Sequence, residues 1–344
     1  MTSNNQFGFK KGSSCSHAIY SVKCVVDHYS QLGSTVNLCL LDLKKAFDKM
    51  HHYGLYIKLM NRLVPNALLC VLEYWFDSCM TCVRWGNDVS NFIALECGVR
   101  QGGVLSPYLF AIFIDDIIKE VKKSELGCKL KHENVGIFIY ADDIILLAPT
   151  VQSLQGMLQV CERELAWLDM SLNTKKSLCM RFGPRYNAKC HDICTANGDC
   201  LSWVNSCRYL GVYLCASSYF KCSFSYAKRS FYRSFNSIFG KIGRIASEEV
   251  ILHLVNMKCV PALLYGLDAC PINISDKRSF DFVFTRVLMK LFKTSSIIII
   301  DECYEMFNLK HMSQLISERK CRFLGNFHKG NELCNLIVSY TSDV

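Results

Sequence analysis

Three aspartates lie where apolar segments of this sequence end or turn. Asp42 comes near the end of the run VNLCLLDL (36–43), and Asp142 and Asp143 lie between the two apolar halves of VGIFIYADDIILLAP (135–149). An acid beside an apolar strand is costly unless water, a cation or a metal ion stabilises it. If the two strands are neighbours, the carboxylates meet at one edge of a sheet. Two Mg²⁺ ions held there, roughly 4 Å apart, would stabilise an in-line phosphoryl transfer.

The same aspartates have a simpler interpretation. Asp is a favoured turn residue, so Asp142 and Asp143 taken alone fit solvent-facing turn acids about equally well. A second acidic pair, Asp115 and Asp116, lies about two turns into a predicted helix, where the two side chains point in different directions. We interpret this second pair as structural.

The hydrophobic pattern predicts the elements that position these acids. Helices are expected at about 16–31, 52–63, 65–78, 106–123 and 152–169. Strands are expected at 36–43, 177–183 and 208–215, and hairpins at 80–97 and 135–149. Ser106 and Pro107 form a typical helix start, with Ser as the N-cap and Pro as the first helical residue. From about residue 220 onward the pattern becomes mainly helical.

Composition excludes several classes of protein. Of the 344 residues 51% are hydrophobic and 20% are charged, which favours a sizeable core and excludes a disordered chain. No apolar run is long enough for a membrane-spanning helix, and the first residues lack the apolar region of a secretory signal. The 21 cysteines are therefore interpreted as mostly reduced intracellular thiols, and the spacing of those at 190–207 does not predict a structural zinc site. The net charge of +9 suits a polyanionic partner.

Six motifs follow one another in a recognisable order. They are QFGFKKG (6–12), LLDLKKAFDK (40–49), GVRQGGVLSPYLF (98–110), YADD (140–143), LNTKK (172–176) and RYLGV (208–212). In this order and spacing the chain resembles the reverse transcriptase of non-LTR (LINE-type) retrotransposons of the jockey and CR1-like groups. The later segment LLYGLDAC (263–270) resembles the thumb of such enzymes.

The resemblance implies an α+β, right-hand polymerase fold. Residues 1–218 would form partial fingers and a palm, with an antiparallel sheet flanked by helices. Residues 219–344 would form a mainly helical thumb and a C-terminal segment. Relatives carry finger strands before the first motif, so the resemblance also implies that this sequence is truncated at its N-terminus.

The resemblance also implies a two-metal catalytic site. Asp42 and Asp142 would hold two Mg²⁺ ions, for which Mn²⁺ is a possible substitute, and the backbone carbonyl of Leu43 would be a further ligand. Asp143 would be a less critical metal-site carboxylate that tunes the charge.

Further roles follow for residues that would contact substrate. Lys176 would protonate the leaving pyrophosphate, with Lys175 as a near rival for that role. Phe47 would lie under the incoming sugar and exclude a 2′-hydroxyl, although without the resemblance it is more simply a core residue. The loop that would position the template and the incoming base carries Gln101, Gly102 and Gly103.

Two regions are expected to contact nucleic acid. The primer-grip hairpin of the family matches Tyr209, Leu210 and Gly211. Residues 219–247 contain no acid and interleave cations with aromatics, which favours duplex binding through Lys228, Arg229 and Arg233. The same pattern fits an amphipathic helix with aromatics in the core, and both interpretations can hold together.

RNA-directed DNA synthesis is the function that these assignments imply. A primer 3′-hydroxyl would attack the α-phosphate of a deoxynucleoside triphosphate, with an RNA template, a DNA primer and dNTPs as partners, no membrane and no assigned protein partner. One alternative is a truncated remnant that binds RNA or RNA–DNA duplex without polymerising. Another is a group II intron-type or other cellular reverse transcriptase, because YADD is shared, although LLDLKKAFDK and GVRQGGVLSP favour the LINE type. The expected location is intracellular, in the nucleus, the cytoplasm or both.

Overall fold

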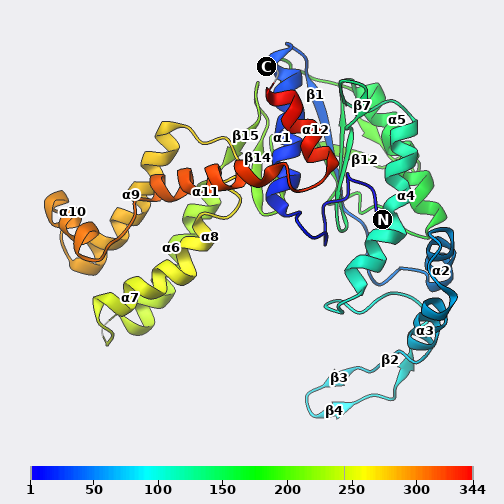
Figure 1. The fold of residues 1–344 in the computed structure, drawn as a ribbon, viewed down its shortest axis with the longest axis horizontal. Coiled ribbons are helices and arrows are strands. Elements are labelled where there is room, and N and C mark those ends of the chain that lie inside the picture. Colours follow the sequence, from blue (N-terminus) through cyan, green and yellow to red (C-terminus); the bar gives the residue numbers. More distant parts are fainter. Residues whose placement is uncertain (1, 244, 343–344) are drawn as a thin grey trace.

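A six-stranded mixed sheet forms the centre of the computed structural model, which describes residues 2–243 and 245–342 (Figure 1). The strand order is β11–β12–β10–β1–β9–β8. The strands are β1 (Val36–Leu41), β8 (Ile137–Tyr140), β9 (Asp143–Ala148), β10 (Leu178–Phe182), β11 (Ile193–Cys194) and β12 (Cys200–Trp203). Every pairing is antiparallel except that of β10 with β12. The predicted strands at 36–43 and 177–183 and the predicted 135–149 hairpin are therefore confirmed, and all six residues of β1 are buried.

The register of β1 and β9 brings the three candidate acids together. Leu41 pairs with Ile144 in antiparallel register, so Asp42 and Asp143 follow at the same edge of the sheet. Tyr140 pairs with Asp143 across the hairpin, which leaves Ala141 and Asp142 as its two-residue turn.

Helices cover both faces of this sheet (Figure 1). On one face, α4 (Ser106–Lys123) and α5 (Val151–Trp167) pack on a core that includes Cys39, Ile139 and Leu146. On the other face, α1 (Cys15–Gln31) packs on a core that includes Leu38 and Ile145, with α12 (Glu332–Ser342) alongside it. The alternation of inward-facing residues along β1 and β9 thus supplies two separate apolar layers.

The start of α4 differs from the prediction by one residue. Ser106 is the first helical residue, and Leu105 occupies the N-cap position without a side-chain capping bond. The predicted Ser106 N-cap is therefore wrong. Ser106 is instead buried, and its hydroxyl lies only 2.6 Å from the position that a Cβ on residue 103 would occupy, which favours glycine there.

Two arms extend from the central sheet (Figure 1). One contains α2 (His52–Asn61), α3 (Asn66–Asp77) and the short strands β2 (Met80–Thr81), β3 (Arg84–Trp85), β4 (Asp88–Val89) and β5 (Ile93–Ala94). A further hairpin, β6 (Lys129–Leu130) with β7 (Glu133–Asn134), follows α4. The predicted 80–97 hairpin is confirmed as two short two-stranded pairs.

The other arm is helical, as predicted for residues after 220. It contains α6 (Ser225–Ile242), α7 (Glu248–Leu254), a π-helical turn (Val255–Cys259), α8 (Val260–Leu263), α9 (Ile274–Phe292), α10 (Ile297–Met306) and α11 (Met312–Phe327). Residue 244 of the cation-rich stretch lies outside the described residues. No helix among the described residues is both long and apolar enough to span a membrane.

A three-stranded sheet lies between the central sheet and the helical arm in the sequence, and one prediction for it is wrong. Residues 208–215 do not form one strand, because β13 (Ser206–Tyr209) and β14 (Val212–Cys215) pair as a hairpin, followed by β15 (Lys221–Ser223). Leu210 and Gly211 form the turn, with positive φ angles of 44° and 87°. The apolar pattern alone concealed this turn, because leucine is not a typical turn residue, whereas the resemblance already implied a hairpin here.

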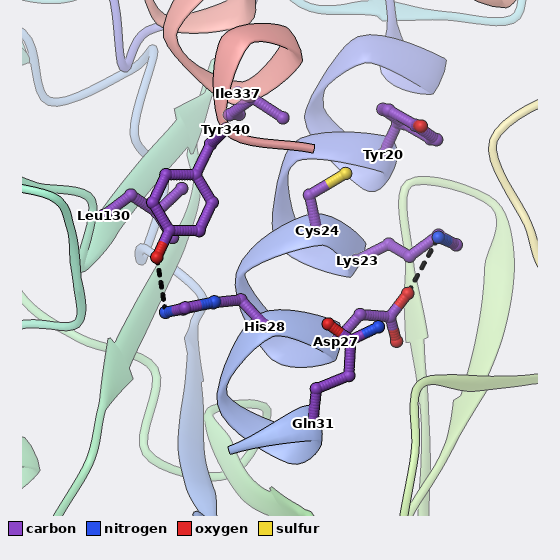
Figure 2. Close-up of a pocket in the computed structure, with 9 residues that line it drawn as sticks. All are labelled: Tyr20, Lys23, Cys24, Asp27, His28, Gln31, Leu130, Ile337 and Tyr340. Atoms are coloured by element: carbon purple, nitrogen blue, oxygen red, sulfur yellow. Dashed lines mark hydrogen bonds and ion pairs between the residues drawn. The ribbon is translucent and has the colours of Figure 1, made fainter. Parts of the chain in front are cut away.

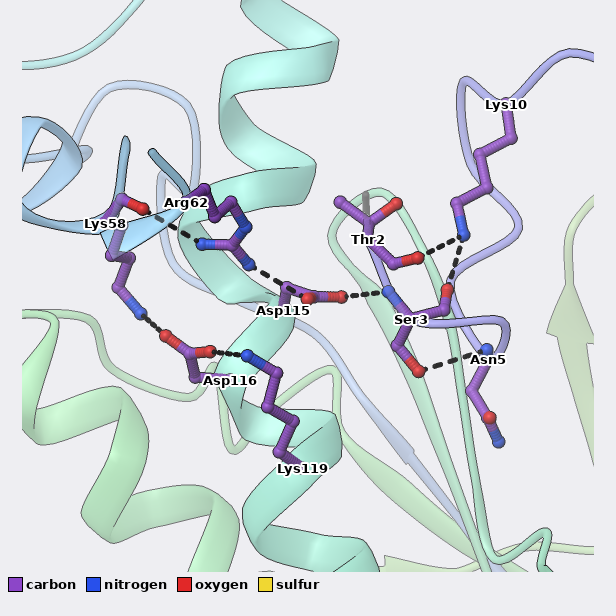
Figure 3. Close-up of polar contacts among 9 residues, drawn as sticks. All are labelled: Thr2, Ser3, Asn5, Lys10, Lys58, Arg62, Asp115, Asp116 and Lys119. Atoms are coloured by element: carbon purple, nitrogen blue, oxygen red, sulfur yellow. Dashed lines mark hydrogen bonds and ion pairs between the residues drawn. The ribbon is translucent and has the colours of Figure 1, made fainter. Parts of the chain in front are cut away.

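Asp115 and Asp116 form a structural ion network, as predicted (Figure 3). Asp115 is 1% exposed, pairs with Arg62 at 2.9 Å and accepts a hydrogen bond from the Ser3 amide at 2.6 Å. Asp116 points elsewhere and pairs with the Lys58 and Lys119 ammonium groups. These two cations hold the pKa of the Asp116 carboxyl below its ordinary value, at about 2, against the opposing effect of burial.

Candidate active site

A cleft of about 630 Å³ lies at the sheet edge where the three acids meet. Its lining comes from the segment after β1, the loop before α4, the β8–β9 turn and the loop after α5. The lining residues are Asp42, Leu43, Lys44, Lys45, Ala46, Phe47, Lys49, Gln101, Asp142, Ser171, Asn173 and Lys176. The cleft therefore brings together four of the six sequence motifs.

The loop after α5 holds Asp42 from its backbone and its side chain. The Asp42 amide donates to the Ser177 hydroxyl at 3.0 Å, and the Asn173 side-chain amide donates to Asp42 Oδ2 at 3.0 Å. Lys176 Nζ lies 3.8 Å from the same oxygen, and its side chain is 70% exposed. Lys176 lines the cleft, and Lys175 is not among its lining residues, so the geometry favours Lys176 over its rival.

The turn of the β8–β9 hairpin places Asp142 among the residues that line the cleft, whereas Asp143 is not among them. Ala141 has a φ of 56°, which is uncommon for a residue with a Cβ and marks a constrained turn. Burial, followed by the negative charges of Asp142 and Asp42, raises the pKa of Asp143 from 3.8 to about 6. The three carboxylates therefore repel one another in the absence of a cation.

Replacing Asp143 with asparagine is expected to stabilise the metal-free protein at pH 8 by about 1 kcal/mol. The raised pKa means that the folded protein binds more protons than the unfolded chain between about pH 4 and pH 6. Wild-type stability therefore falls as pH rises through that window, and the variant avoids this loss. Urea unfolding in the presence of a chelator, at pH 4.5 and at pH 8, measures the free energy of unfolding of the variant and of wild type. An equal difference between variant and wild type at both pH values contradicts the explanation.

The donors at this edge fit a hard divalent cation. Asp42 and Asp142 offer carboxylate oxygens, and Leu43 offers a backbone carbonyl. Leu43 faces Leu172 in an isolated bridge whose hydrogen bonds, Asn173 N to Asp42 O and Lys44 N to Ser171 O, leave the Leu43 carbonyl unused. The described residues contain no group of three or more His, Cys, Asp and Glu side chains arranged to hold a metal ion. The fit therefore depends on two carboxylates and a backbone oxygen.

A second backbone contact, between the segment after β1 and the loop before α4, places Phe47 and Gln101 beside the cleft. The Gly98 and Val99 amides donate to the carbonyls of Met50 and Phe47, at 2.8 and 2.9 Å. Phe47 stacks on Phe110 of α4 with ring centroids 4.6 Å apart, is half-buried, and turns its remaining surface to the cleft. The core-residue and substrate-contact interpretations of Phe47 thus describe two faces of one ring.

The neighbouring glycines have separate reasons for their identity. Gly102 has a φ of 87° and no atom within 4 Å of the position that a Cβ would occupy, so its backbone conformation alone favours glycine. Gly103 leaves room for the Ser106 hydroxyl. Neither glycine is among the residues that line the cleft.

The segment that precedes α1 supports the β8–β9 hairpin from the edge of the sheet. The Phe7 amide donates to the Ile139 carbonyl at 2.8 Å, and the Ile139 amide donates to the Asn5 carbonyl at 2.9 Å, so this segment pairs with β8. Gly8 then lies against the turn, because a Cβ there would be 2.5 Å from the Ala141 nitrogen. The first motif is thereby explained as a support for the YADD turn.

Replacing Gly8 with alanine is expected to displace this turn. The clash is with backbone rather than with a flexible side chain, so relaxation costs about 1–3 kcal/mol of stability. Urea unfolding measures the change. Gly325→Ala in α11 is the matched control, because nothing lies within 4 Å of a Cβ at that position. Equal stability of the two variants contradicts the proposed contact.

The predicted primer-grip residues divide into buried and accessible ones. Tyr209 is 1% exposed, and burial followed by the charge of Asp143 raises the pKa of its hydroxyl. The Tyr209 ring belongs to the core, and the place of this residue in the primer grip stays a prediction. Leu210 and Gly211 form the turn and keep the predicted place.

The residues of the cation-rich helix α6 also divide into buried and exposed ones. Phe231 and Phe235 are buried, which confirms that the aromatic face packs inward. Lys228 donates to the Ser279 hydroxyl at 2.6 Å and lies 4.7 Å from the Phe280 ring centroid, so it is directed at α9. Arg229 and Arg233 are exposed. These two arginines keep their place as predicted nucleic-acid contacts, whereas Lys228 is held within the helical arm.

Sequence reasoning missed six residues that line the cleft, and four of them bear on its charge or on the position of Asp42. Lys44, Lys45 and Lys49 line it and supply positive charge, and Asn173 positions the Asp42 carboxylate. Lysines so close in sequence to Asp42 are themselves a signal, because residues that follow a strand end stay near its edge.

A second cavity, of about 330 Å³, lies between α1 and α12 (Figure 2). Its polar groups pair with one another: Lys23 with Asp27 at 2.8 Å, and the Tyr340 hydroxyl with His28 at 3.3 Å. The second of these contacts joins the two helices. None of the three candidate carboxylates lines this cavity.

Comparison with known proteins shows what this chain is similar to. A sequence profile described as reverse transcriptase (RNA-dependent DNA polymerase) matches residues 1–214. The RNA-directed DNA polymerase from mobile element jockey of Drosophila funebris is 26% identical over 282 residues, covering 76% of this chain and 29% of that protein. The retrovirus-related Pol polyprotein from the type-2 retrotransposable element R2DM of Drosophila melanogaster is 24% identical over 225 residues, covering 63% of this chain and 21% of that protein.

The structural comparison confirms the fold. The structure of apo telomerase from Candida tropicalis aligns with a TM-score of 0.50 at 12% identity, covering 98% of this chain and 54% of that chain. This likeness, with the mixed sheet and the helical arm, confirms the predicted α+β polymerase fold. The chain spans less than a third of the length of the two curated relatives. The family profile covers well over half of the sequence, and the chain belongs to the reverse transcriptase (RNA-dependent DNA polymerase) family, in its LINE-type, non-LTR branch.

Proposed function

We propose that this chain catalyses RNA-directed DNA synthesis at the cleft around Asp42 and Asp142. The observation that supports this most strongly is the convergence of four separated motifs on one cleft of about 630 Å³. We place the partial fingers and palm in residues 1–218 and the thumb with the C-terminal segment in 219–344. The action of the chain in the nucleus or the cytoplasm is part of the same proposal, and the 21 free cysteines support an intracellular location.

Asp42, the Leu43 carbonyl and Asp142 would hold two Mg²⁺ ions, or Mn²⁺ as a substitute, with Asp143 adding charge beside them. Such ions supply stabilisation of the charge that develops on the attacking and leaving oxygens. The chain's own part is to hold the donors in place, and Asn173 and Ser177 do this for Asp42.

The other cleft residues bind the incoming dNTP in this proposal. Phe47 is fixed by its stacking on Phe110, so its free face excludes a 2′-hydroxyl without moving. Lys44, Lys45 and Lys49 attract the triphosphate, and Lys176 donates a proton to the leaving pyrophosphate. Gln101 contacts the base, and its loop, with Gly102 and Gly103, lies beside the template.

The template and primer lie between the two arms in this proposal. The Leu210–Gly211 turn holds the primer end, and the exposed Arg229 and Arg233 contact phosphates of the RNA–DNA duplex. Acid-free residues 219–247 and the net charge of +9 support a polyanionic partner.

Primer extension tests the proposal. The purified chain is incubated with an RNA template, an annealed DNA primer, dNTPs and Mg²⁺ or Mn²⁺, and a DNA template serves as the comparison. Extension on RNA supports the assignment. Tight primer–template binding without extension under either metal would contradict it and favour the binding-only alternative.

A further inference from the structure

The turn between β13 and β14 is in direct contact with a segment of the helical arm. The Tyr265 hydroxyl donates a hydrogen bond to the Leu210 carbonyl at 3.2 Å. Its ring lies over Gly211, because a Cβ on that glycine would be 2.6 Å from Tyr265 Cε1. Only a residue without a side chain at 211 allows both the positive φ and the contact with the ring.

The contact is reciprocal. Gly266 has a φ of 70°, and a Cβ there would lie 2.7 Å from Val212 Cγ1. Each turn therefore presents a glycine to a side chain of the other turn. Such close packing fixes the distance between the two backbones, since neither glycine can be enlarged without separating them.

A second set of contacts leads from Tyr265 to the catalytic hairpin. The Cys15 side chain at the start of α1 lies near the hydroxyls of both Tyr265 and Tyr140. Tyr140 directly precedes the Ala141–Asp142 turn. Ser16, the next residue of α1, donates to Asp268 Oδ1 at 3.0 Å. The Leu210–Gly211 turn and the catalytic turn are thus connected through one helix end.

We propose that Tyr265 is a positioning residue that sets the distance between the Leu210–Gly211 turn and the carboxylates of Asp42 and Asp142, and so determines where a primer 3′ end is held. This inference rests on the function proposed above. Tyr265 does not line the cleft, whose lining comes only from residues between 42 and 176. Its influence therefore falls on the primer strand and not on the incoming nucleotide.

Tyr265→Phe tests this assignment in the whole chain, because it keeps the ring on Gly211 and removes only the hydroxyl. We expect the KM for primer–template to rise about 2- to 10-fold, the value of one hydrogen bond, with the KM for dNTP unchanged. Tyr186→Phe is the matched control, because Tyr186 is 38% exposed and follows β10 at the end of the sheet opposite Asp42. Equal primer–template KM values for Tyr265→Phe and wild type overturn the proposal.

Hydrogen exchange provides a readout that does not require activity. The amides of residues 209–212 are expected to exchange faster in Tyr265→Phe than in wild type, while urea unfolding of the whole chain stays the same. Faster exchange in a chain whose wild type extends no primer supports the positioning contact and overturns the proposed function alone. Unchanged exchange in an active chain overturns the positioning contact alone.

Discussion

Asp142→Asn is expected to reduce primer extension at least about 10³-fold, because the cleft loses one of the two carboxylates that would hold the metal ions. Stabilisation of developing charge by bound metal is worth several kcal/mol, and each 1.36 kcal/mol is tenfold in rate. Asparagine keeps the shape of the side chain, so the hairpin turn at Ala141 is preserved. Asp42→Asn is expected to have an effect of the same order.

Initial rates on an RNA template with saturating dNTPs measure this loss. Asp192→Asn is the matched control, since Asp192 is an exposed loop carboxylate away from the cleft. Binding of primer–template to Asp142→Asn is expected to remain, because Arg229 and the Leu210–Gly211 turn are not among the residues that line the cleft with Asp142. Extension by Asp142→Asn within tenfold of wild type would remove this carboxylate from the catalytic set.

Asp115→Ala is expected to lower the free energy of unfolding by about 3–5 kcal/mol, the largest stability effect we expect of any single substitution. The carboxylate is 1% exposed, and its removal leaves Arg62, itself 16% exposed, without its partner. The Ser3 amide loses its acceptor at the same time (Figure 3). The cost arises from the polar groups left behind rather than from the strength of the original pair.

Urea unfolding followed by circular dichroism checks this value. Glu318→Ala is the comparison, because Glu318 and its partner Lys310 are both more than a third exposed and their pair is screened by water. The free energy of unfolding is expected to fall much less in Glu318→Ala than in Asp115→Ala. Similar midpoints for the two variants would show that the Asp115 network does not contribute to stability.

The sequence predicts the sheet edge well because the relevant signals are local. The apolar runs before Asp42 and on both sides of Asp142 are strands in the structure, and the hairpin between them closes with a two-residue turn. The inward face of α6 also follows from local periodicity, with Phe231 and Phe235 buried. In each case the residues that determine the outcome are neighbours in the chain.

Several features that the sequence does not predict depend on contacts between distant segments. Tyr209 is in the core, where its hydroxyl lies near the Asp143 carboxylate of β9, and nothing near residue 209 in the sequence reveals that. Lys228 is drawn to Ser279 and Phe280, about fifty residues later in the chain. The role of Gly8 is equally non-local, since the clash that excludes a larger residue is with Ala141.

The pairing of residues 5–7 with β8 has a consequence for solubility. β8 lies at the end of the strand order, and an uncovered edge strand offers free amides and carbonyls to any other extended chain. The Asn5 carbonyl and the Phe7 amide occupy the groups that Ile139 would otherwise present. The strand that leads into the catalytic turn is thereby protected from pairing with a second molecule. Resistance to aggregation and the geometry of the active site thus depend on the same short segment.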